Sequence, residues 1–264
     1  TRRAWRHHGR RAVLMLPGPL TTGEFYQIPV DGYRGRDIVA SEGAFAFTAD
    51  FEGTGESSYP VDGRSPSQAS QVEAMRVVVR YIRLIRDVRR VDVLGESWGG
   101  GVAAELCADA HRVRSCVLAS MLYETPTDFA NMTFRSPGFH GFLDSMPDGY
   151  LNTFPDLYLG LTMPMEPAVS AWTLVEMPGR YTTVPLYDVF DLPCFDATSS
   201  RVPGLLVQGA LDPNQTIDDA LALVADYGDE MALTVIEGGG HIPRTEPPPM
   251  NDVYWDSVLD FLDL

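Results

Sequence analysis

The chain has 264 residues, of which 45% are hydrophobic and 21% charged, and its 36 acidic and 20 basic residues give a formal net charge of −16. This length allows one or two domains with a substantial core, and the apolar content excludes a disordered chain. Nucleic acids and anionic membranes attract basic surfaces, so this charge argues against both. We therefore expect neither a nucleic acid nor a membrane as a partner.

The three cysteines, Cys107, Cys116 and Cys194, match no zinc or disulfide framework. Cys107 and Cys116 lie in apolar runs, so we interpret them as small buried hydrophobic residues, which favours a reducing compartment. The apolar run at 12–16 is too short for a secretion signal, and no stretch approaches the ~18 apolar residues of a membrane span. These features predict a soluble, cytoplasmic protein.

Short apolar runs alternate with helix-length amphipathic segments along the chain, a pattern typical of a mostly parallel α/β sheet. The predicted strands are 12–16, 44–49, 91–94, 115–119, 204–207 and 232–236. The predicted helices lie between the second and third strands and near 97–110, 216–227 and 251–262.

The first of these helices, which precedes residue 91, is amphipathic. Ser70 and Glu73 have the spacing of a capping box, which predicts the helix start near them. One apolar stripe on this helix is predicted to face the core, and it consists of Val72, Met75, Val79, Ile82 and Ile85.

Residues 121–200 break the alternation of strands and helices. This 30% of the chain holds 13 of its 27 aromatic residues, 6 of its 10 methionines, and ten acidic residues against two arginines. The segment can be an irregular insertion with a small core of its own, or a lid whose adaptable apolar face lines a pocket. We favour the lid, and we divide the chain into a core of residues 1–120 and 201–264 and a lid of residues 121–200.

The segment Gly95-Glu96-Ser97-Trp98-Gly99 directly follows the predicted strand 91–94 and directly precedes a helix. This is the pattern G-x-S-x-G in a strand–turn–helix context, which presents a strained serine as a nucleophile. The N–H of Trp98 can then point at an oxyanion. A glycine-rich turn with a helix-capping serine is the plainer alternative, and the context favours a catalytic Ser97.

Two further loops carry an acid and a histidine. Asp212 follows the apolar run 204–207 on a loop where a carboxylate can orient a histidine, although Asp before Pro is also a common turn pair. His241, alone among five histidines, lies on a glycine-rich loop after a predicted strand, which favours a general base over a structural histidine. Glu124, after the strand that precedes the lid, is the alternative acid, but we prefer Asp212.

Several motifs resemble those of the α/β-hydrolase superfamily over nearly all of the chain outside the lid. The order Ser97, Asp212, His241 is that of its triad. The run from Asp50 to Ser57 is similar to its D-x-R-G-x-G-x-S loop, with glutamate in place of arginine, and Gly240-His241 with Glu246-Pro247 resembles its G-H-x-x-x-x-E-x-P pattern. The resemblance implies an α/β-hydrolase fold, with a mostly parallel central sheet flanked by helices and an inserted lid.

The loop after the first strand departs from the superfamily pattern. It reads Leu16-Pro17-Gly18-Pro19-Leu20 and lacks the usual histidine. An acyl-transfer site needs a second oxyanion donor from this loop, and proline has no N–H to give. We expect Gly18 to be that donor, with Leu20 as the fallback. Gly18-Pro19 and Trp98 are similar to the proline iminopeptidase branch.

The function that we favour is a cofactor-free serine hydrolase for an ester, lactone or thioester of a bulky hydrophobic small molecule, with secondary metabolism as one setting for such a substrate. No metal-ligand cluster, phosphate-binding loop or dinucleotide motif is apparent, so we expect no metal and no cofactor. The apolar lid suggests the kind of substrate, and the residues predicted to line its pocket are Leu20, Met121, Tyr123 and Phe129.

Three other functions stay open at this point. A lyase or cyclase that tailors a natural product could use the same triad without hydrolysis, and the unusual proline-rich loop motivates it. An aminopeptidase similar to proline iminopeptidase could bind a free amine through acids of the lid. A binding protein on an inactive hydrolase scaffold is disfavoured by the complete triad. The sequence does not indicate an oligomeric state.

Overall fold

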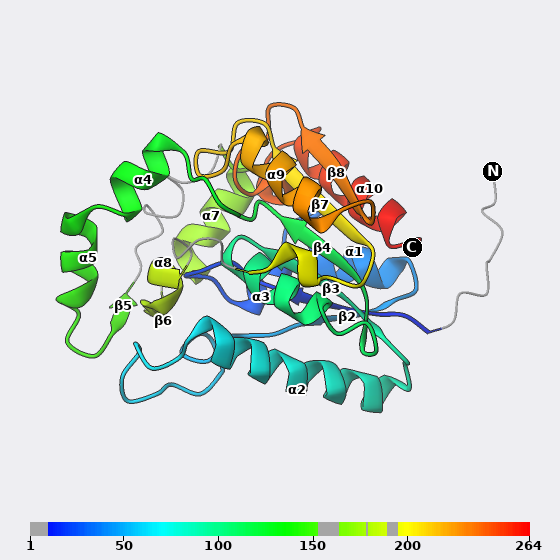
Figure 1. The fold of residues 1–264 in the computed structure, drawn as a ribbon, viewed down its shortest axis with the longest axis horizontal. Helices are drawn as coiled ribbons and strands as arrows, with labels where there is room; N and C mark the ends of the chain where they lie inside the picture. Colours follow the sequence, from blue (N-terminus) through cyan, green and yellow to red (C-terminus); the bar gives the residue numbers. More distant parts are fainter. Residues whose placement is uncertain (1–9, 153–163, 178, 189–194) are drawn as a thin grey trace.

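The computed structural model describes residues 10–152, 164–177, 179–188 and 195–264. In this part of the chain, six strands form a sheet of order β2-β1-β3-β4-β7-β8, in which all neighbours are parallel (Figure 1). The strands are β1 (Ala12–Leu16), β2 (Phe45–Thr48), β3 (Val91–Glu96), β4 (Val113–Ala119), β7 (Gly204–Gly209) and β8 (Met231–Ile236). Each coincides with a predicted apolar run to within two residues, which confirms the α/β fold class.

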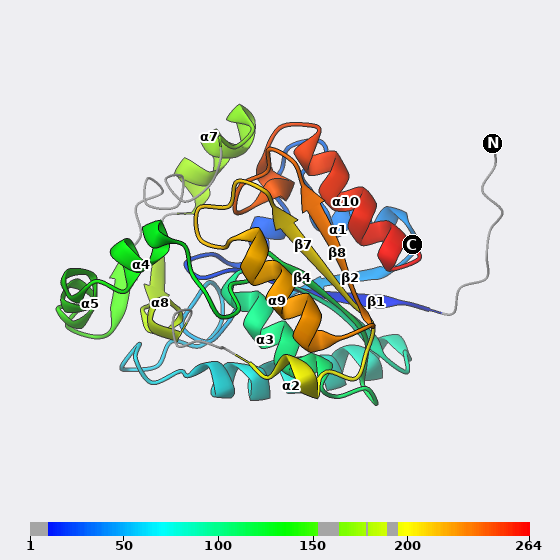
Figure 2. The same cartoon turned by 45° about the horizontal axis from the view of Figure 1, so that its top comes forward.

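Helices cover both faces of the sheet (Figure 2). One face packs against α2 (Gln68–Arg86), α3 (Trp98–Cys107) and α9 (Ile217–Tyr227), and the other against α1 (Gly35–Ser41) and α10 (Met250–Phe261). Successive side chains of a strand point to opposite faces, so strands covered on both sides are apolar at most positions. This explains why the strands appear in the sequence as continuous apolar runs.

Helix α2 differs from its prediction in two details. Its capping box joins Ser67 to Ser70, because each of these hydroxyls accepts from the other residue's backbone N–H. The predicted box of Ser70 with Glu73 is therefore wrong by one turn, and Glu73 pairs with Arg76 instead. Ile85 is 42% exposed while the rest of the predicted stripe is buried. At 100° per residue it lies about 100° from the centre of that stripe, so it points away from the sheet.

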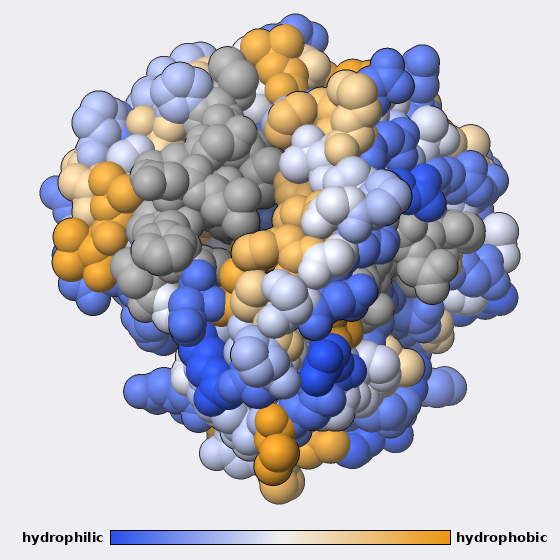
Figure 3. Space-filling view, turned by 90° about the vertical axis from the view of Figure 1, so that its left-hand side faces the viewer, coloured by the Kyte–Doolittle hydropathy of each residue, from blue (hydrophilic) through white to orange (hydrophobic). Residues whose placement is uncertain are grey.

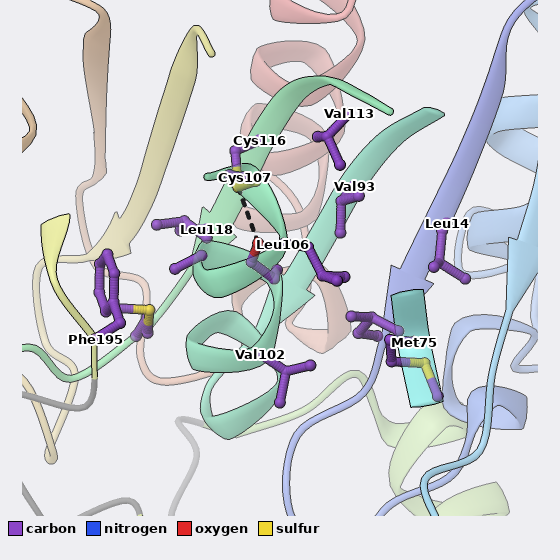
Figure 4. Packing of buried hydrophobic residues seen from close by; sticks show 14 of the residues in the cluster. Leu14, Met75, Val93, Val102, Leu106, Cys107, Val113, Cys116, Leu118 and Phe195 are labelled. Carbon is purple, nitrogen blue, oxygen red and sulfur yellow. Dashed lines mark hydrogen bonds between the residues drawn. A yellow bond between two sulfur atoms is a disulfide. The ribbon is translucent and has the colours of Figure 1, made fainter. Parts of the chain in front are cut away.

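The structure joins Cys107, at the end of α3, to Cys116, in β4, in a disulfide bond (Figure 4). The expectation that the cysteine spacing forms no disulfide is therefore wrong. The tight return from α3 to β4 brings the two Cα atoms within 6.1 Å, a proximity that no spacing rule reveals. The bond removes the argument for a reducing compartment, and Cys194 lies outside the described residues.

Residues 128–152, 164–177 and 179–188 of the segment 121–200, which we call the inserted segment, lie beyond the carboxyl ends of the strands (Figure 1). Its described elements are α4 (Asp128–Phe134), α5 (Pro137–Asp144), α7 (Pro167–Glu176), α8 (Val184–Asp188) and the antiparallel pair β5 (Tyr150–Asn152) and β6 (Arg180–Thr182). Among the helices of the described ranges, none is long and apolar enough to span a bilayer.

Three short 3-10 helices complete the described elements. They are η1 (Gly23–Tyr26), η2 (Ala197–Ser199) and η3 (Pro243–Thr245). The first follows the loop after β1 and the third follows His241, so both border the carboxyl edge of the sheet. Residues of the inserted segment pack on this same edge, since Met165, Val169 and Met177 share one buried cluster with Phe25 of η1 and with Ile242.

Candidate active site

The site lies where the order of the sheet reverses. The chain proceeds from β1 to β2 on one side of β1, and β3 then pairs on the other side. In open α/β sheets the loops after two such strands diverge and leave a crevice at their carboxyl ends. Ser97 follows β3 directly, and Gly18 from the loop after β1 lies so close that an added Cβ would be 3.3 Å from the Cβ of Ser97.

Ser97 occupies a sharp turn between β3 and α3. Its φ is 53° and its ψ is −124°, a conformation that costs a residue other than glycine on the order of 1–3 kcal/mol. Its N–H donates to the carbonyl of Ala119, and its carbonyl accepts from the N–H of Gly100, so neighbouring elements hold the turn. Only glycine fits at Gly95, where a Cβ would lie 2.2 Å from the carbonyl oxygen of Gly99.

The replacement Gly99→Ala is expected to disrupt this turn. A Cβ there would lie 2.2 Å from the carbonyl oxygen of Pro17, so the loop after β1 would have to move away from Ser97. We expect a loss of 2–4 kcal/mol or so in the free energy of unfolding, measured by urea denaturation, and slower modification of Ser97 by a fluorophosphonate probe. Gly141→Ala in α5 is the control, because its added Cβ meets no atom within 4 Å. Equal stability of the two variants would contradict this account.

Ser97, His241 and Asp212 are brought together by the fold. His241 Nε2 lies 3.1 Å from Ser97 Oγ, and His241 Nδ1 lies 2.9 Å from Asp212 Oδ2. All three residues are buried. Because the carboxylate can only accept, Nδ1 carries a proton and Nε2 is left to accept the hydroxyl proton of Ser97. This arrangement can move a proton from Ser97 to His241.

Asp212 is held by donors that sequence reasoning missed. Its Oδ1 accepts from the backbone N–H groups of Asn214, at 2.8 Å, and Gln215, at 3.3 Å. Its Oδ2 accepts from Gln208 Nε2 at 3.0 Å, in addition to His241. These bonds orient the carboxylate toward the imidazole. The available signal was Gln208 itself, a fully buried amide in the otherwise apolar strand β7.

Glu124, the alternative acid, is exposed and its backbone N–H donates to Asp219 at 2.8 Å. The residue that contacts the imidazole is Asp212. The described residues hold no group of three or more His, Cys, Asp and Glu side chains that could bind a metal ion.

The histidine loop carries two groups with raised pKa values. Burial lowers the pKa of His241, but the charge and hydrogen bond of Asp212, together with Glu96 and Glu246, outweigh it, so the pKa lies above the usual 6.5. Burial raises the pKa of Glu246 to about 7, while its bond from the Gly240 N–H and the nearby His241 oppose the rise. The hydrogen bond from the Gly240 N–H to Glu246 holds the backbone just before His241.

The reactivity of Ser97 is expected to rise with pH through a midpoint above 6.5. Only neutral His241 can take the hydroxyl proton, and its raised pKa keeps it protonated to higher pH than a free histidine. The measurement is the second-order rate constant for labelling by a fluorophosphonate between pH 5 and 9. A midpoint at or below 6 would show that the acidic neighbours do not outweigh burial.

A buried ion pair next to Ser97 was also missed. Arg244, in η3, donates from Nε to Glu96 Oε2 at 2.7 Å and from Nη2 to Glu96 Oε1 at 3.0 Å. Its Nη1 donates to the carbonyl of Phe25 at 2.7 Å, and its guanidinium lies over the rings of Phe25 and Tyr26. The sequence contained a sign of this ion pair. Glu96 lies between an apolar strand and the nucleophile turn, where its side chain must be buried and therefore needs a partner.

Two of the predicted substrate-lining residues lie beside the site loops. Leu20 packs with Leu143, Leu151, Tyr181 and Leu186 of the inserted segment. Met121 lies against the start of α3, since a Cβ on Gly100 would approach its side chain to 2.9 Å.

The contacts of the other two predicted lining residues lie elsewhere. The N–H and hydroxyl of Tyr123 donate to Asp219 and Asp226, which ties this residue to α9. Phe129 is 43% exposed on α4. Figure 3 shows the side of the molecule that lies at the left in Figure 1, where apolar patches alternate with hydrophilic surface.

Comparisons with known proteins agree on the fold. A model of the "Alpha/beta hydrolase family" matches residues 13–253. A hydrolase from Pseudomonas aeruginosa PA01 has a TM-score of 0.70 at 18% identity, covering 97% of this chain and 91% of that one. A soluble variant of the Saccharomyces cerevisiae monoglyceride lipase has a TM-score of 0.75 at 17% identity, covering 98% and 88%. An enol-lactonase from Burkholderia xenovorans LB400 has a TM-score of 0.65 at 18% identity, covering 98% of this chain and 94% of that one.

These identities are too low to transfer an activity, and no curated protein sequence matches the chain. The family model, in contrast, covers more than nine-tenths of the sequence, from β1 to α10. The sheet order and the turn at Ser97 agree with that match. The chain belongs to the alpha/beta hydrolase family.

Proposed function

We propose that the protein is a cofactor-free serine hydrolase that cleaves an ester, lactone or thioester of a bulky hydrophobic small molecule. The observation that carries this proposal is the pair of contacts that link Ser97 to His241 and His241 to Asp212 at the carboxyl ends of the strands. Ser97 Oγ attacks the substrate carbonyl while its proton passes to His241 Nε2. Asp212 orients the imidazole and stabilises its protonated form. Protonated His241 then protonates the leaving group, and an activated water releases the acyl group from Ser97.

The oxyanion is held by the backbone N–H groups of Trp98 and Gly18 in this mechanism. Trp98 is the first residue of α3, so its N–H has no acceptor within the helix and adds to the positive end of the helix dipole. Gly18 is supported by its position against Ser97 and by its two proline neighbours, which have no N–H to offer. Leu20, with a φ of 57°, is the fallback donor.

The inserted segment acts as the lid of this hydrolase and provides an apolar wall. Two buried clusters support this role, because one joins the segment to Leu20 in the loop after β1 and the other joins it to Ile242, next to His241. Both loops carry residues of the candidate site. A hydrophobic acyl or alcohol group is therefore the chemistry that fits.

An aminopeptidase of the proline iminopeptidase type is less well supported. Such an enzyme would need an acid from the lid that faces the site and binds the substrate amine. Seven acidic residues of the inserted segment have a described exposure, and all of them are at least partly exposed to solvent: Glu124, Asp128, Asp144, Asp148, Glu166, Glu176 and Asp196. This distribution favours an uncharged substrate.

The test combines labelling of Ser97 by a fluorophosphonate with a panel of substrates. The panel consists of aryl esters of increasing acyl length, lactones, acyl thioesters and a prolyl arylamide. We expect labelling at Ser97 and a preference for longer acyl chains. Incorporation of ¹⁸O from labelled water into the product distinguishes hydrolysis from elimination or cyclisation. An unlabelled Ser97 together with no turnover of any ester would overturn the proposal.

A further inference from the structure

We infer that Glu96 and Arg244 form a clamp that holds the Ser97 turn and the His241 loop at their working distance, so that both are positioning residues. This inference rests on the proposed hydrolase function. The two residues occupy informative places in the chain, since Glu96 directly precedes Ser97 and Arg244 lies three residues after His241. The two loops that carry the nucleophile and the base are thus joined by one ion pair.

The geometry of the pair fixes the two side chains relative to each other. Two parallel hydrogen bonds, at 2.7 and 3.0 Å, link the guanidinium of Arg244 to both carboxylate oxygens of Glu96. A bidentate pair fixes orientation as well as distance. Glu96 is 1% exposed and Arg244 2% exposed, so water neither competes for these bonds nor screens them.

Arg244 also reaches the loop system that follows β1. Its Nη1 donates to the carbonyl of Phe25 in η1, and its guanidinium lies 4.5 Å from the centre of the Phe25 ring and 4.2 Å from that of Tyr26. The carbonyl of Arg244 itself accepts from Asn251 in α10. One side chain therefore joins the three chain segments from which the nucleophile, the base and the proposed oxyanion donor come.

A contribution to folding stability does not by itself explain a buried ion pair. Removing two charges from water costs more than their attraction often returns, and apolar residues of similar size are frequently as stable or more stable. A second, matched pair shows the contrast, because buried Arg11 and Asp92 form an ion pair at the amino ends of β1 and β3, away from the site. The Glu96–Arg244 pair differs in that both partners lie within three residues of a reacting group.

The clamp also places charge around the imidazole. The charged groups that act on His241 are Asp212, Glu96 and Glu246, and all three raise its pKa. Removal of both clamp residues should therefore lower the pKa of His241 as well as loosen its position.

The test uses the full chain with Glu96→Leu and Arg244→Met combined, which leaves no charge unpaired. We expect the double variant to fold with a melting temperature close to that of the original protein. Its kcat per labelled site on an aryl ester should fall ten- to a hundredfold, with KM changed less than threefold. Arg244→Lys keeps the positive charge but cannot form the two parallel hydrogen bonds of the guanidinium, so it should retain an intermediate kcat.

Nuclear magnetic resonance gives a second readout that does not depend on turnover. The pKa of His241 and the low-field signal of its Nδ1 proton are measured in both proteins, with His241→Gln to assign them. We expect a lower pKa and a weakened signal in the double variant. If the original protein is not labelled at Ser97, the proposed function fails, and these two signals still decide whether the clamp exists.

Arg11→Met is the matched control, because it breaks the remote ion pair. It should lower the melting temperature without changing kcat or the pKa of His241. The clamp is overturned if the double variant keeps the original kcat per labelled site and the original His241 pKa. A double variant that fails to fold is replaced by Arg244→Lys, for which an unchanged kcat and His241 signal overturn the inference equally.

Discussion

Replacement of Ser97 by alanine is expected to abolish activity, with a fall in kcat of at least about 10⁴-fold on any ester that the protein hydrolyses. The hydroxyl that alanine lacks is the hydrogen-bond partner of His241 Nε2, at 3.1 Å, and no other hydrogen bond of Nε2 is found among the described residues. The measurement is steady-state hydrolysis together with fluorophosphonate labelling.

The fold of Ser97→Ala should be preserved, because alanine is smaller and the backbone bonds of the turn do not involve the hydroxyl. Alanine must adopt the same φ of 53°, so a small loss of stability is expected. Full esterase activity in this variant would mean that another residue is the nucleophile. A matching circular dichroism spectrum excludes unfolding as the cause of a loss.

Replacement of Asp212 by asparagine is expected to lower kcat by roughly 10³–10⁴-fold with little change in KM. An amide at this position can donate to Nδ1 and so favours the tautomer in which Nε2 carries the proton. His241 then cannot accept the proton of Ser97. The amide also removes the negative charge that stabilises the imidazolium.

Glu124→Gln is the matched control for Asp212→Asn, since Glu124 is the other acid that the sequence allowed. It is exposed and is expected to leave kcat unchanged. A large loss in Glu124→Gln with a small loss in Asp212→Asn would reverse the assignment. Both variants are compared per active site, by titration with the fluorophosphonate.

The sequence was sufficient for the sheet because its strands are covered on both faces. A strand such as β1, with Ala12–Leu16 wholly buried, must be apolar throughout, and this makes it visible without any knowledge of its neighbours. The turn at Ser97 was visible for a related reason. The backbone needs glycine at Gly95 and Gly99, where a side chain would strike a carbonyl, and this requirement leaves a local pattern.

Features that depend on contacts between distant segments were not visible. The Cys107–Cys116 bond depends on how tightly the chain returns from α3 to β4, and the Glu96–Arg244 pair joins residues 148 apart. Neither is encoded by the spacing of neighbouring residues.

By itself, the sequence determined the strands, the nucleophile turn and the order of Ser97, Asp212 and His241, because burial and backbone sterics constrain residue types locally. Only the tertiary structure decided that Asp212, and not Glu124, contacts His241, and that Gln208 donates a hydrogen bond to the carboxylate of Asp212. It also decided that the seven acidic residues of the inserted segment whose exposure is described are at least partly exposed to solvent. The net charge of −16 counts those residues, but it does not say whether their side chains face solvent or the candidate site. That depends on how the segment packs.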